Sequence, residues 1–113
     1  MDYQGNDFYC DQVLSGKVKP RMVKEDKACL AFYHTKPFWP VHIVVIPKLH
    51  VPSLTQLGSY SASDLQHLIC FVAEVAAMVE NQYGAARVLT NLGQYQDSKH
   101  LHFHINFGSP DEV

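Results

Sequence analysis

The chain has 113 residues, of which 47% are hydrophobic, and its formal net charge at pH 7 is −2. This length suits one compact domain with its own core, and we expect a single domain over residues 1–113. The Lys and Arg residues are scattered, which argues against a nucleic-acid-binding face. No apolar run is long enough to predict a membrane span, so we expect no membrane partner.

The chain contains three cysteines, Cys10, Cys29 and Cys70, an odd number without paired spacing. Such usage argues against a disulfide framework and favours a reducing compartment. The first residues, MDYQGNDFYCDQ, are acidic and polar, unlike a signal peptide. We therefore expect a cytoplasmic protein. Cys29 and Cys70 lie among apolar residues, so we expect both side chains in the core.

The first half of the chain is expected to contain one short helix and three strands. Residues 6–16 begin with Asn or Asp and end with Gly around apolar positions, a pattern typical of a helix. Residues 17–26 follow as a turn and a short edge strand. Residues 28–35 are apolar and aromatic, and residues 41–47 form a β-branched run closed by a proline, so both segments predict strands.

The longest predicted element is a helix over residues 61–84. Its apolar residues recur at the spacing of one helical face, which indicates a helix packed on a core. Ser61 or Ser63 can cap the start of this helix, because a hydroxyl accepts hydrogen bonds from the first turn. Gly84 can end it, because glycine adopts the left-handed conformation of a helix C-terminus.

Residues 85–91 and 100–107 predict two further strands, separated by a polar loop. Strands thus both precede and follow the long helix. This order predicts an α+β domain in which an antiparallel sheet packs against one long helix and one short N-terminal helix.

The last predicted strand, HLHFHINF, carries three histidines in alternation with apolar residues. Successive side chains of a strand point to opposite faces. One face would therefore carry His100, His102, His104 and Asn106. The other face would carry Leu101, Phe103, Ile105 and Phe107. The apolar set can pack on the long helix, which leaves the imidazoles to line an open face or cleft.

Three interpretations of these histidines compete. The first is a solvated polar face, which strict alternation without Lys, Glu or Thr disfavours. The second is a metal site, although same-face neighbours lie about 6.6 Å apart at the backbone and zinc ligands must converge to about 2.0 Å from the metal. A further ligand would have to come from His42 or His50. The third is nucleophilic catalysis, because a neutral imidazole can attack phosphorus and flanking imidazoles can donate to phosphate oxygens.

The alternating motif resembles the signature of the histidine triad (HIT) superfamily. Residues 29–51 are similar to the family's other hallmark, in which an apolar strand and a Pro-containing turn lead to His42, the segment Ile46-Pro47-Lys48 and His50. The resemblance covers roughly residues 7–108. It implies a HIT-like fold, usually homodimeric, and nucleotide hydrolase or nucleotidyl transferase activity at an α-phosphate. The implied reaction requires no cofactor.

The resemblance also implies roles for individual residues. His102 would be the nucleophile, His104 and His100 would flank the phosphate and leaving group, and His42 would support the cluster from the neighbouring strand. Further positions match family residues that contact the phosphate or form the nucleoside pocket, or stand close to such a position. These expected substrate-binding residues are Phe8, Phe32, Tyr33, His34, Asn91, Gln96 and Ser98.

The sequence departs from the family at several positions. His34 stands where many members have an acidic residue that binds the ribose hydroxyls, and it would be a weaker, pH-dependent partner. Asp97 stands where many members place a Ser or Thr against the phosphate, and its carboxylate would repel a phosphate. Ser98, next to it, can take that role.

The family resemblance also raises the question of zinc. Some bacterial members bind it through two N-terminal cysteines and two histidines. Here Asp7 replaces the first cysteine, while Cys10, His50 and His100 are present. A zinc site with these ligands is chemically feasible. We nevertheless favour no metal, because Cys10 also suits a helix core.

Three functions remain in competition. The first is hydrolysis of nucleoside phosphoramidates or adenylated small molecules through a nucleotidyl-histidine intermediate. The second is hydrolysis of dinucleoside polyphosphates, for which the extra positive charge is not obvious. The third is a binding module that holds a nucleotide or metal with little turnover. The expected partners are a nucleotide or nucleotide-conjugate substrate and a second copy of the chain.

Overall fold

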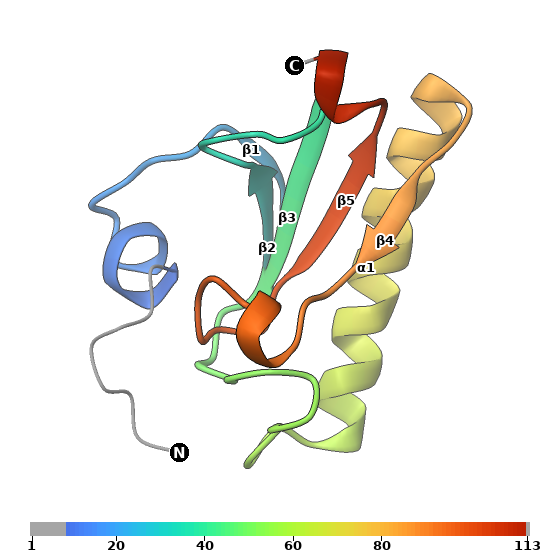
Figure 1. Cartoon of the computed structure of the whole chain (residues 1–113). Coiled ribbons are helices and arrows are strands. Elements are labelled where there is room, and N and C mark those ends of the chain that lie inside the picture. The colour runs from blue at the N-terminus through green and yellow to red at the C-terminus, as the bar shows by residue number, and fades with distance from the viewer. Residues whose placement is uncertain (1–8, 113) are drawn as a thin grey trace.

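The computed structural model describes residues 9–112, apart from the side chains of Asp11 and Gln12, and contains a five-stranded antiparallel sheet. The strands are β1 (Met22–Glu25), β2 (Cys29–Tyr33), β3 (Val41–Pro47), β4 (Arg87–Leu89) and β5 (Phe103–Phe107). Their order across the sheet is β1-β2-β3-β5-β4 (Figure 1). The last strand in the sequence therefore lies inside the sheet, and β1 and β4 form its edges.

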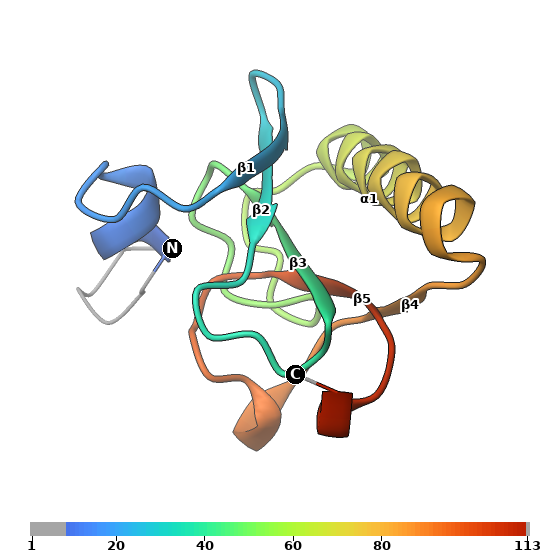
Figure 2. The same ribbon diagram turned by 90° about the horizontal axis from the view of Figure 1, so that it is seen from above.

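The helix α1 (Ala62–Tyr83) covers one face of the sheet, as predicted (Figure 2). The backbone amide of Asp64 donates to the Ser61 hydroxyl at 3.0 Å, and the Ser61 amide donates to the Asp64 carboxylate at 3.1 Å. This reciprocal pair satisfies two amides at the start of the helix. Gly84 ends α1 with a φ of +89°, in the left-handed region that favours glycine.

The main hydrophobic core lies between α1 and this face of the sheet. The helix contributes Leu68, Phe71, Val72, Val75 and Val79. The sheet and the segment before β5 contribute Cys29, Ala31, Val41, Ile43, Val45, Leu101, Phe103 and Ile105. Each large side chain buried in this way stabilises the fold by about 1.5–3 kcal/mol. The predicted packing of the apolar residues of β5 against the long helix is confirmed.

By length and composition alone, α1 also meets the requirements of a membrane span. Its most apolar 18-residue window has a mean hydropathy of 1.4, and 28% of that window is buried. The same composition occurs in core helices of soluble domains. The contacts of α1 with the sheet are those of a core helix.

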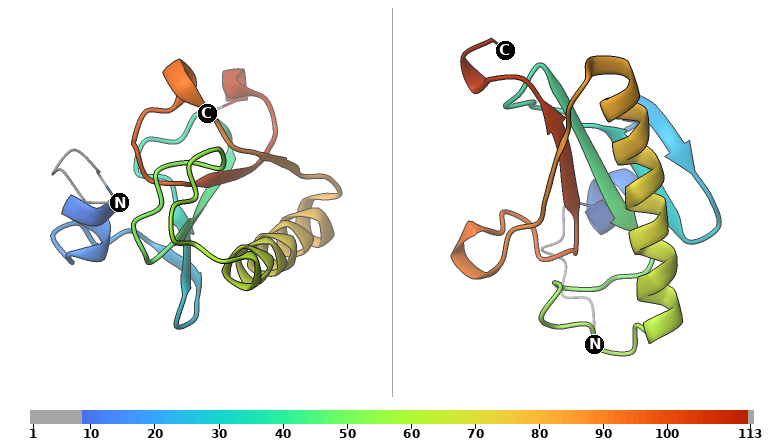
Figure 3. Two further views of the ribbon diagram at one scale, coloured as in Figure 1. Left: turned by 90° about the horizontal axis from the view of Figure 1, so that it is seen from below. Right: turned by 90° about the vertical axis from the view of Figure 1, so that its right-hand side faces the viewer.

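The opposite face of the sheet carries a smaller cluster, covered by the short helix η1 (Tyr9–Leu14). Its buried members are Tyr9, Val13, Leu30, Phe32, Val44 and Ile46. Figure 2 shows η1 and α1 on opposite sides of the sheet. The segment between β4 and β5, which includes the one-turn helix η2 (Gly93–Tyr95), also lies on the side away from α1 (Figure 3). A last turn, η3 (Pro110–Glu112), follows β5.

Two expectations about the chain are corrected. β5 begins at Phe103, whereas the sequence predicts a strand from residue 100. Before it the chain bends, and the amide of Leu101 donates to the carbonyl of Val51 rather than to a neighbouring strand. The side chain of Cys70 is exposed on α1, not in the core, whereas Cys29 is fully buried as predicted.

Candidate active site

A cavity of about 280 Å³ opens on the face of the sheet opposite α1. It is bounded by η1, the end of β2 with the turn that follows, the loop before β5, and β5 itself. The lining residues are Tyr9, Phe32, His34, Thr35, Lys36, Asp97, Ser98, His102 and His104. Two of the three triad histidines, His102 and His104, thus meet in one cavity with aromatic side chains and a buried hydroxyl.

The orientation of His102 is fixed by the backbone. Its Nδ1 lies 2.6 Å from the carbonyl oxygen of His100. Because a carbonyl oxygen can only accept, Nδ1 must carry the proton. A neutral His102 then carries its lone pair on Nε2, which is the form of imidazole that can act as a nucleophile.

A chain of hydrogen bonds fixes the protonation of His104. The amide of Phe38 donates to Nδ1 of His42 at 3.1 Å, so the proton of neutral His42 is on Nε2. This Nε2 donates in turn to Nδ1 of His104 at 2.8 Å. The remaining nitrogen of His104, Nε2, therefore carries a proton. His104 is thereby prepared to donate a hydrogen bond to an oxygen in the cavity.

Burial keeps these imidazoles neutral. It lowers the pKa of His42 to about 3, with the nearby His34, His104 and His102 adding to the effect. It also lowers the pKa of His104 to about 4, again with help from His102 and His34, while the Asp97 carboxylate acts in the opposite direction. Near pH 7 both residues hold the single proton that the hydrogen-bond chain assigns them.

His34 stacks on His42, with ring centroids 4.3 Å apart and planes at 20°. Burial lowers the pKa of His34, and the neighbouring His102 lowers it further. Its Nδ1 accepts the amide of Lys36 at 2.9 Å, so neutral His34 carries its proton on Nε2. A carboxylate at this position could only accept from ribose hydroxyls, whereas His34 offers a donor.

Aromatic rings form one wall of the cavity. Phe32 is 1% exposed and lies on β2, and its ring centroid is 6.0 Å from that of Tyr9. The Tyr9 ring in turn lies 5.0 Å from the ring of His102. A flat base can pack against such a wall beside the nucleophilic ring.

The family model for the HIT domain matches residues 15–108 of the chain. The chain belongs to the HIT domain family. A curated relative, an uncharacterised HIT-like protein of Synechocystis sp., is 33% identical over 108 residues, which cover 92% of each chain. The five-stranded sheet with its single long helix is the HIT-like fold.

Solved structures extend the similarity to three dimensions. A histidine triad protein from Clostridium difficile is 29% identical and has a TM-score of 0.78, with 96% of this chain and 95% of that chain covered. A HIT family hydrolase from Legionella pneumophila is 25% identical and has a TM-score of 0.77, with 91% and 93% covered. The chain is therefore similar over nearly its whole length to a histidine triad protein and to a protein described as a HIT family hydrolase.

Within this HIT domain, His100 is not part of the described cavity lining, unlike His102 and His104. Its ring is fully buried. Its Nε2 donates to the carbonyl of Pro47 at 2.7 Å, and its Nδ1 lies 3.5 Å from the sulfur of Cys10. The ring of Tyr9 lies 5.8 Å from the ring of His100 and 5.0 Å from that of His102, so both imidazoles are on the η1 side of the sheet. The contribution of His100 to the site is its carbonyl, which orients the His102 ring.

Cys10, His50 and His100 come together in the structure. Their ligand atoms lie within 4.8 Å of one another. Because the Nε2 proton of His100 is held by Pro47, its Nδ1 offers a lone pair toward Cys10, the orientation of a metal-bound imidazole. Asp7, the fourth position, lies outside the described residues. The described side chains therefore fit three positions of a tetrahedral site.

Three of the expected substrate-binding residues do not reach the described lining of the cavity. Tyr33 follows Phe32 on β2, so it points to the α1 side of the sheet, where Arg21 lies 4.6 Å from its ring. The side-chain amide of Gln96 donates from Nε2 to the carbonyl of Pro52 at 2.6 Å, so this residue anchors the loop before β5 rather than lining the cavity. Asn91 is half-buried just after β4. Phe8 lies outside the described residues.

The lining also includes residues that the sequence analysis missed. Tyr9 is one of them and forms part of the aromatic wall. Thr35 and Lys36 follow His34 and line the cavity, to which Lys36 adds a cation and Asp97 a carboxylate. Lys36 could have been predicted as a lining residue from the sequence, because it lies only two residues after His34, which was expected in the pocket. Ser98 lines the cavity as expected and is 7% exposed.

Proposed function

We propose that this HIT protein hydrolyses nucleoside phosphoramidates or adenylated small molecules at the α-phosphate. The observation that carries the proposal is the hydrogen bond from Nδ1 of His102 to the His100 carbonyl. It selects the tautomer with a lone pair on Nε2, in a residue that lines the cavity. A nucleophile held in one tautomer does not have to reorganise before it attacks.

In the proposed reaction, Nε2 of His102 attacks the α-phosphorus in line with the leaving group. A P–N bond to the histidine forms as the P–N bond to the substrate amine, or the P–O bond of an adenylate, breaks. A leaving amine takes one proton from solvent. Water then attacks the nucleotidyl-histidine, releases the mononucleotide and returns one proton to solvent, so His102 is regenerated.

The surrounding groups support both steps. Nε2–H of His104 donates to a non-bridging oxygen whose negative charge grows during the attack. The Ser98 hydroxyl can donate to another oxygen. Tyr9 and Phe32 provide the wall for the base, and the Nε2–H of His34 is a donor for the sugar or for a phosphate oxygen.

The charge of the cavity favours small leaving groups over long phosphate chains. Among the described lining residues, Lys36 is the one Lys or Arg and Asp97 is the one carboxylate. These formal charges cancel, whereas a dinucleoside polyphosphate would bring several negative charges. We therefore place dinucleoside polyphosphate hydrolysis second, and a binding module with little turnover third.

The proposed chemistry needs no metal. If zinc binds at Cys10, His50 and His100, it would supply a structural link between η1, the loop after β3 and the segment before β5.

We also propose that a second copy of the chain covers apolar side chains of α1 and of the edge strand β4. Ile69 and Val88 are 45% and 48% exposed there. Sedimentation of the wild type and of Val88→Glu would test this association.

The deciding experiment is intact mass spectrometry during incubation with adenosine phosphoramidate, with free AMP measured in parallel. We expect a transient mass increase of one adenylate and release of AMP, both lost in His102→Ala. Gln66→Ala, an exposed position on α1, is the control and should keep both signals. AMP release by His102→Ala at the wild-type rate would refute the nucleophile. Nucleotide binding without adduct or AMP would favour the binding module.

A further inference from the structure

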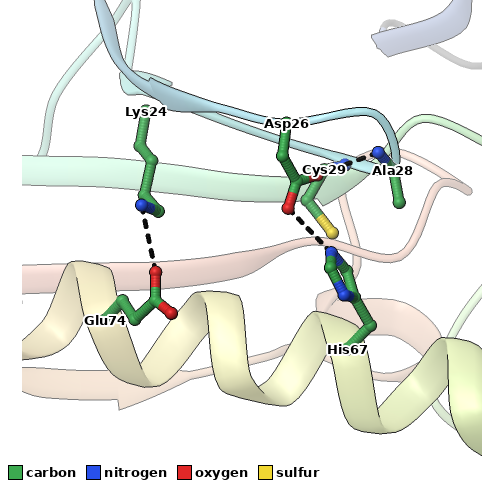
Figure 4. A network of polar contacts seen from close by, with 6 residues as sticks. All are labelled: Lys24, Asp26, Ala28, Cys29, His67 and Glu74. Atoms are coloured by element: carbon green, nitrogen blue, oxygen red, sulfur yellow. Dashed lines mark hydrogen bonds and ion pairs between the residues drawn. The ribbon is translucent and has the colours of Figure 1, made fainter.

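A second group of metal-ligating side chains lies on the α1 side of the sheet, remote from the cavity of the triad. Its members are Asp26, at the β1–β2 turn, Cys29, at the start of β2, and His67, on α1 (Figure 4). One ligand atom from each lies within 4.8 Å of the other two. We propose that these three residues form a site for a zinc-like divalent cation.

The turn is organised to present the Asp26 carboxylate. Its Oδ1 accepts the backbone amides of Ala28 and Cys29, both at 2.8 Å. The amide of Asp26 in turn donates to the carbonyl of Cys29 at 3.0 Å. These bonds hold Oδ1 in the turn and leave Oδ2 toward α1, where it lies 2.7 Å from Nε2 of His67.

The thiol and the imidazole converge on the same point. Figure 4 shows the Cys29 sulfur and the Asp26 carboxylate both directed toward the His67 ring. Zinc bonds of about 2.0–2.3 Å in a tetrahedron place ligand atoms about 3.3–3.7 Å from one another. Insertion of the ion would therefore increase the distance between Asp26 Oδ2 and His67 Nε2 by less than about 1 Å. His67 can provide this movement, because 53% of its side chain is exposed.

The ligand types select the class of ion. One thiolate, one imidazole and one carboxylate suit zinc, whereas magnesium and calcium prefer oxygen ligands alone. As the ion binds, the Cys29 thiol releases its proton to solvent and the sulfur bonds to the metal. Of the three ligands, His67 lines a neighbouring cavity, together with Asp64 and the cations Lys27 and Lys48. An ion could approach from this side, with a water as fourth ligand.

The proposed ion would join the β1–β2 hairpin to α1. In its absence that junction rests on the Asp26–His67 pair and on an ion pair of 3.0 Å between Lys24 and Glu74 (Figure 4). Both are largely exposed, and such pairs contribute little. Binding only to the folded chain would therefore raise the unfolding temperature as the concentration of the ion increases.

The test is a titration of chelator-treated full-length protein with Co²⁺, followed by absorption. It is made in a Cys10→Ser background, which removes the thiol of the other candidate site. We expect one Co²⁺ per chain with thiolate-to-cobalt charge transfer, and displacement by Zn²⁺. Imidazoles of the triad could also take up Co²⁺, but they would not give this charge-transfer band.

Variants of each ligand complete the test. Cys29→Ser should abolish the charge-transfer band. His67→Ala changes an exposed side chain, so the variant should fold. It should weaken Co²⁺ binding at least about 10- to 100-fold, because loss of a residue that only hydrogen-bonds to a metal ligand already costs that much. Asp26→Asn keeps an oxygen for the turn but loses the charge. Glu74→Gln breaks the neighbouring ion pair without touching a ligand, so it should bind Co²⁺ like the parent.

Any of three results would overturn the proposal. The first is absence of a charge-transfer band in the folded Cys10→Ser protein. The second is a band that persists with equal affinity in His67→Ala and Asp26→Asn. The third is a band that disappears in Cys70→Ser, which would assign the thiolate to an exposed cysteine outside the group.

Discussion

His42 donates from Nε2 to Nδ1 of His104 at 2.8 Å, and this single bond decides which nitrogen of His104 carries its proton. His42 itself does not line the cavity in the described part of the chain. It acts through His104 and is a positioning residue. The two residues come from adjacent strands, since β3 and β5 pair with Val44 opposite His104 and His42 opposite Asn106.

Replacement of His42 by Ala should therefore lower kcat more than it changes KM. Without its donor, His104 can take the other tautomer, which would point a lone pair at the phosphate oxygen. We expect a loss of about 10²-fold, the lower end of the range for assisted proton transfer. Steady-state kinetics with adenosine phosphoramidate would measure it. His42→Gln, whose amide can still donate, should recover part of the rate. Equal loss in both variants would argue against the proposed relay.

Acid should destabilise the fold through the same pair. The pKa values of His42 and His104 in the folded state are about 3 and about 4, whereas an unfolded histidine titrates near 6.5. Between pH 6.5 and pH 4 the unfolded state thus binds more protons, so the free energy of unfolding falls as pH falls. Above pH 6.5 this contribution is fully present.

Urea unfolding at pH 7 and pH 5 measures that decrease. The window lies above the ordinary range of carboxyl groups, so histidines dominate it. His104→Gln should show a smaller difference between the two pH values than the wild type. A difference that is unchanged in His104→Gln would contradict the assignment.

Tyr9 should matter for binding of the base. Its ring forms the aromatic wall with Phe32, so Tyr9→Ala would remove a large part of that contact. We expect KM to rise about 10-fold, which corresponds to about 1.4 kcal/mol, with a smaller change in kcat. Tyr9→Phe keeps the ring and should behave like the wild type. If Tyr9→Phe is as impaired as Tyr9→Ala, the hydroxyl rather than the ring carries the effect.

Asp97 should weaken the binding of an anionic substrate. Its carboxylate is exposed at the cavity, so its repulsion of a phosphate is screened by salt. Asp97→Asn should lower KM by a few-fold at low ionic strength, and the difference from the wild type should shrink as salt is added. Asp111→Asn, a carboxylate in η3 outside the described cavity lining, is the matched control. A salt-independent effect would point to a change of loop structure.

Gly108 is required by the turn that follows β5. Its φ is +95°, and a Cβ there would lie 2.7 Å from Cγ of Pro40. Gly108→Ala should therefore destabilise the fold by about 1–3 kcal/mol through backbone strain and overlap. Thermal unfolding would measure it. Gly58→Ala, which has a φ of +60° but open space around its Cβ, separates strain from overlap and should cost less.

Much of this architecture could be predicted from the sequence, because it depends on local patterns. The Ser61 cap, the Gly84 end and the apolar spacing between them define α1, and alternation in β5 predicts which residues face the helix. His102 could be chosen because the triad motif is specific. The cavity with His34, Phe32 and Ser98 was expected on the same grounds.

Other features depend on tertiary contacts that no local pattern encodes. The bend before β5 is stabilised by the bond from Leu101 to Val51, and it turns His100 toward Pro47 and Cys10. Alternation predicts the face that His100 shares with His102, but it does not predict that Pro47 and Cys10 contact the His100 ring. Tyr9 likewise joins the wall through its contact with Phe32, whereas the resemblance implied Phe8, which lies outside the described residues.

The pairing of the three central strands has a consequence for anyone who redesigns this chain. Because β2, β3 and β5 pair without a bulge between them, the two faces of the sheet separate by the parity of the residue number. Odd positions such as Ala31, Ile43 and Ile105 pack under α1, and even positions such as Phe32, His42 and His104 belong to the side of the cavity. Stability and chemistry can thus be altered at alternate residues of the same strand, whereas deletion of one residue would exchange the two faces for every residue that follows it in that strand.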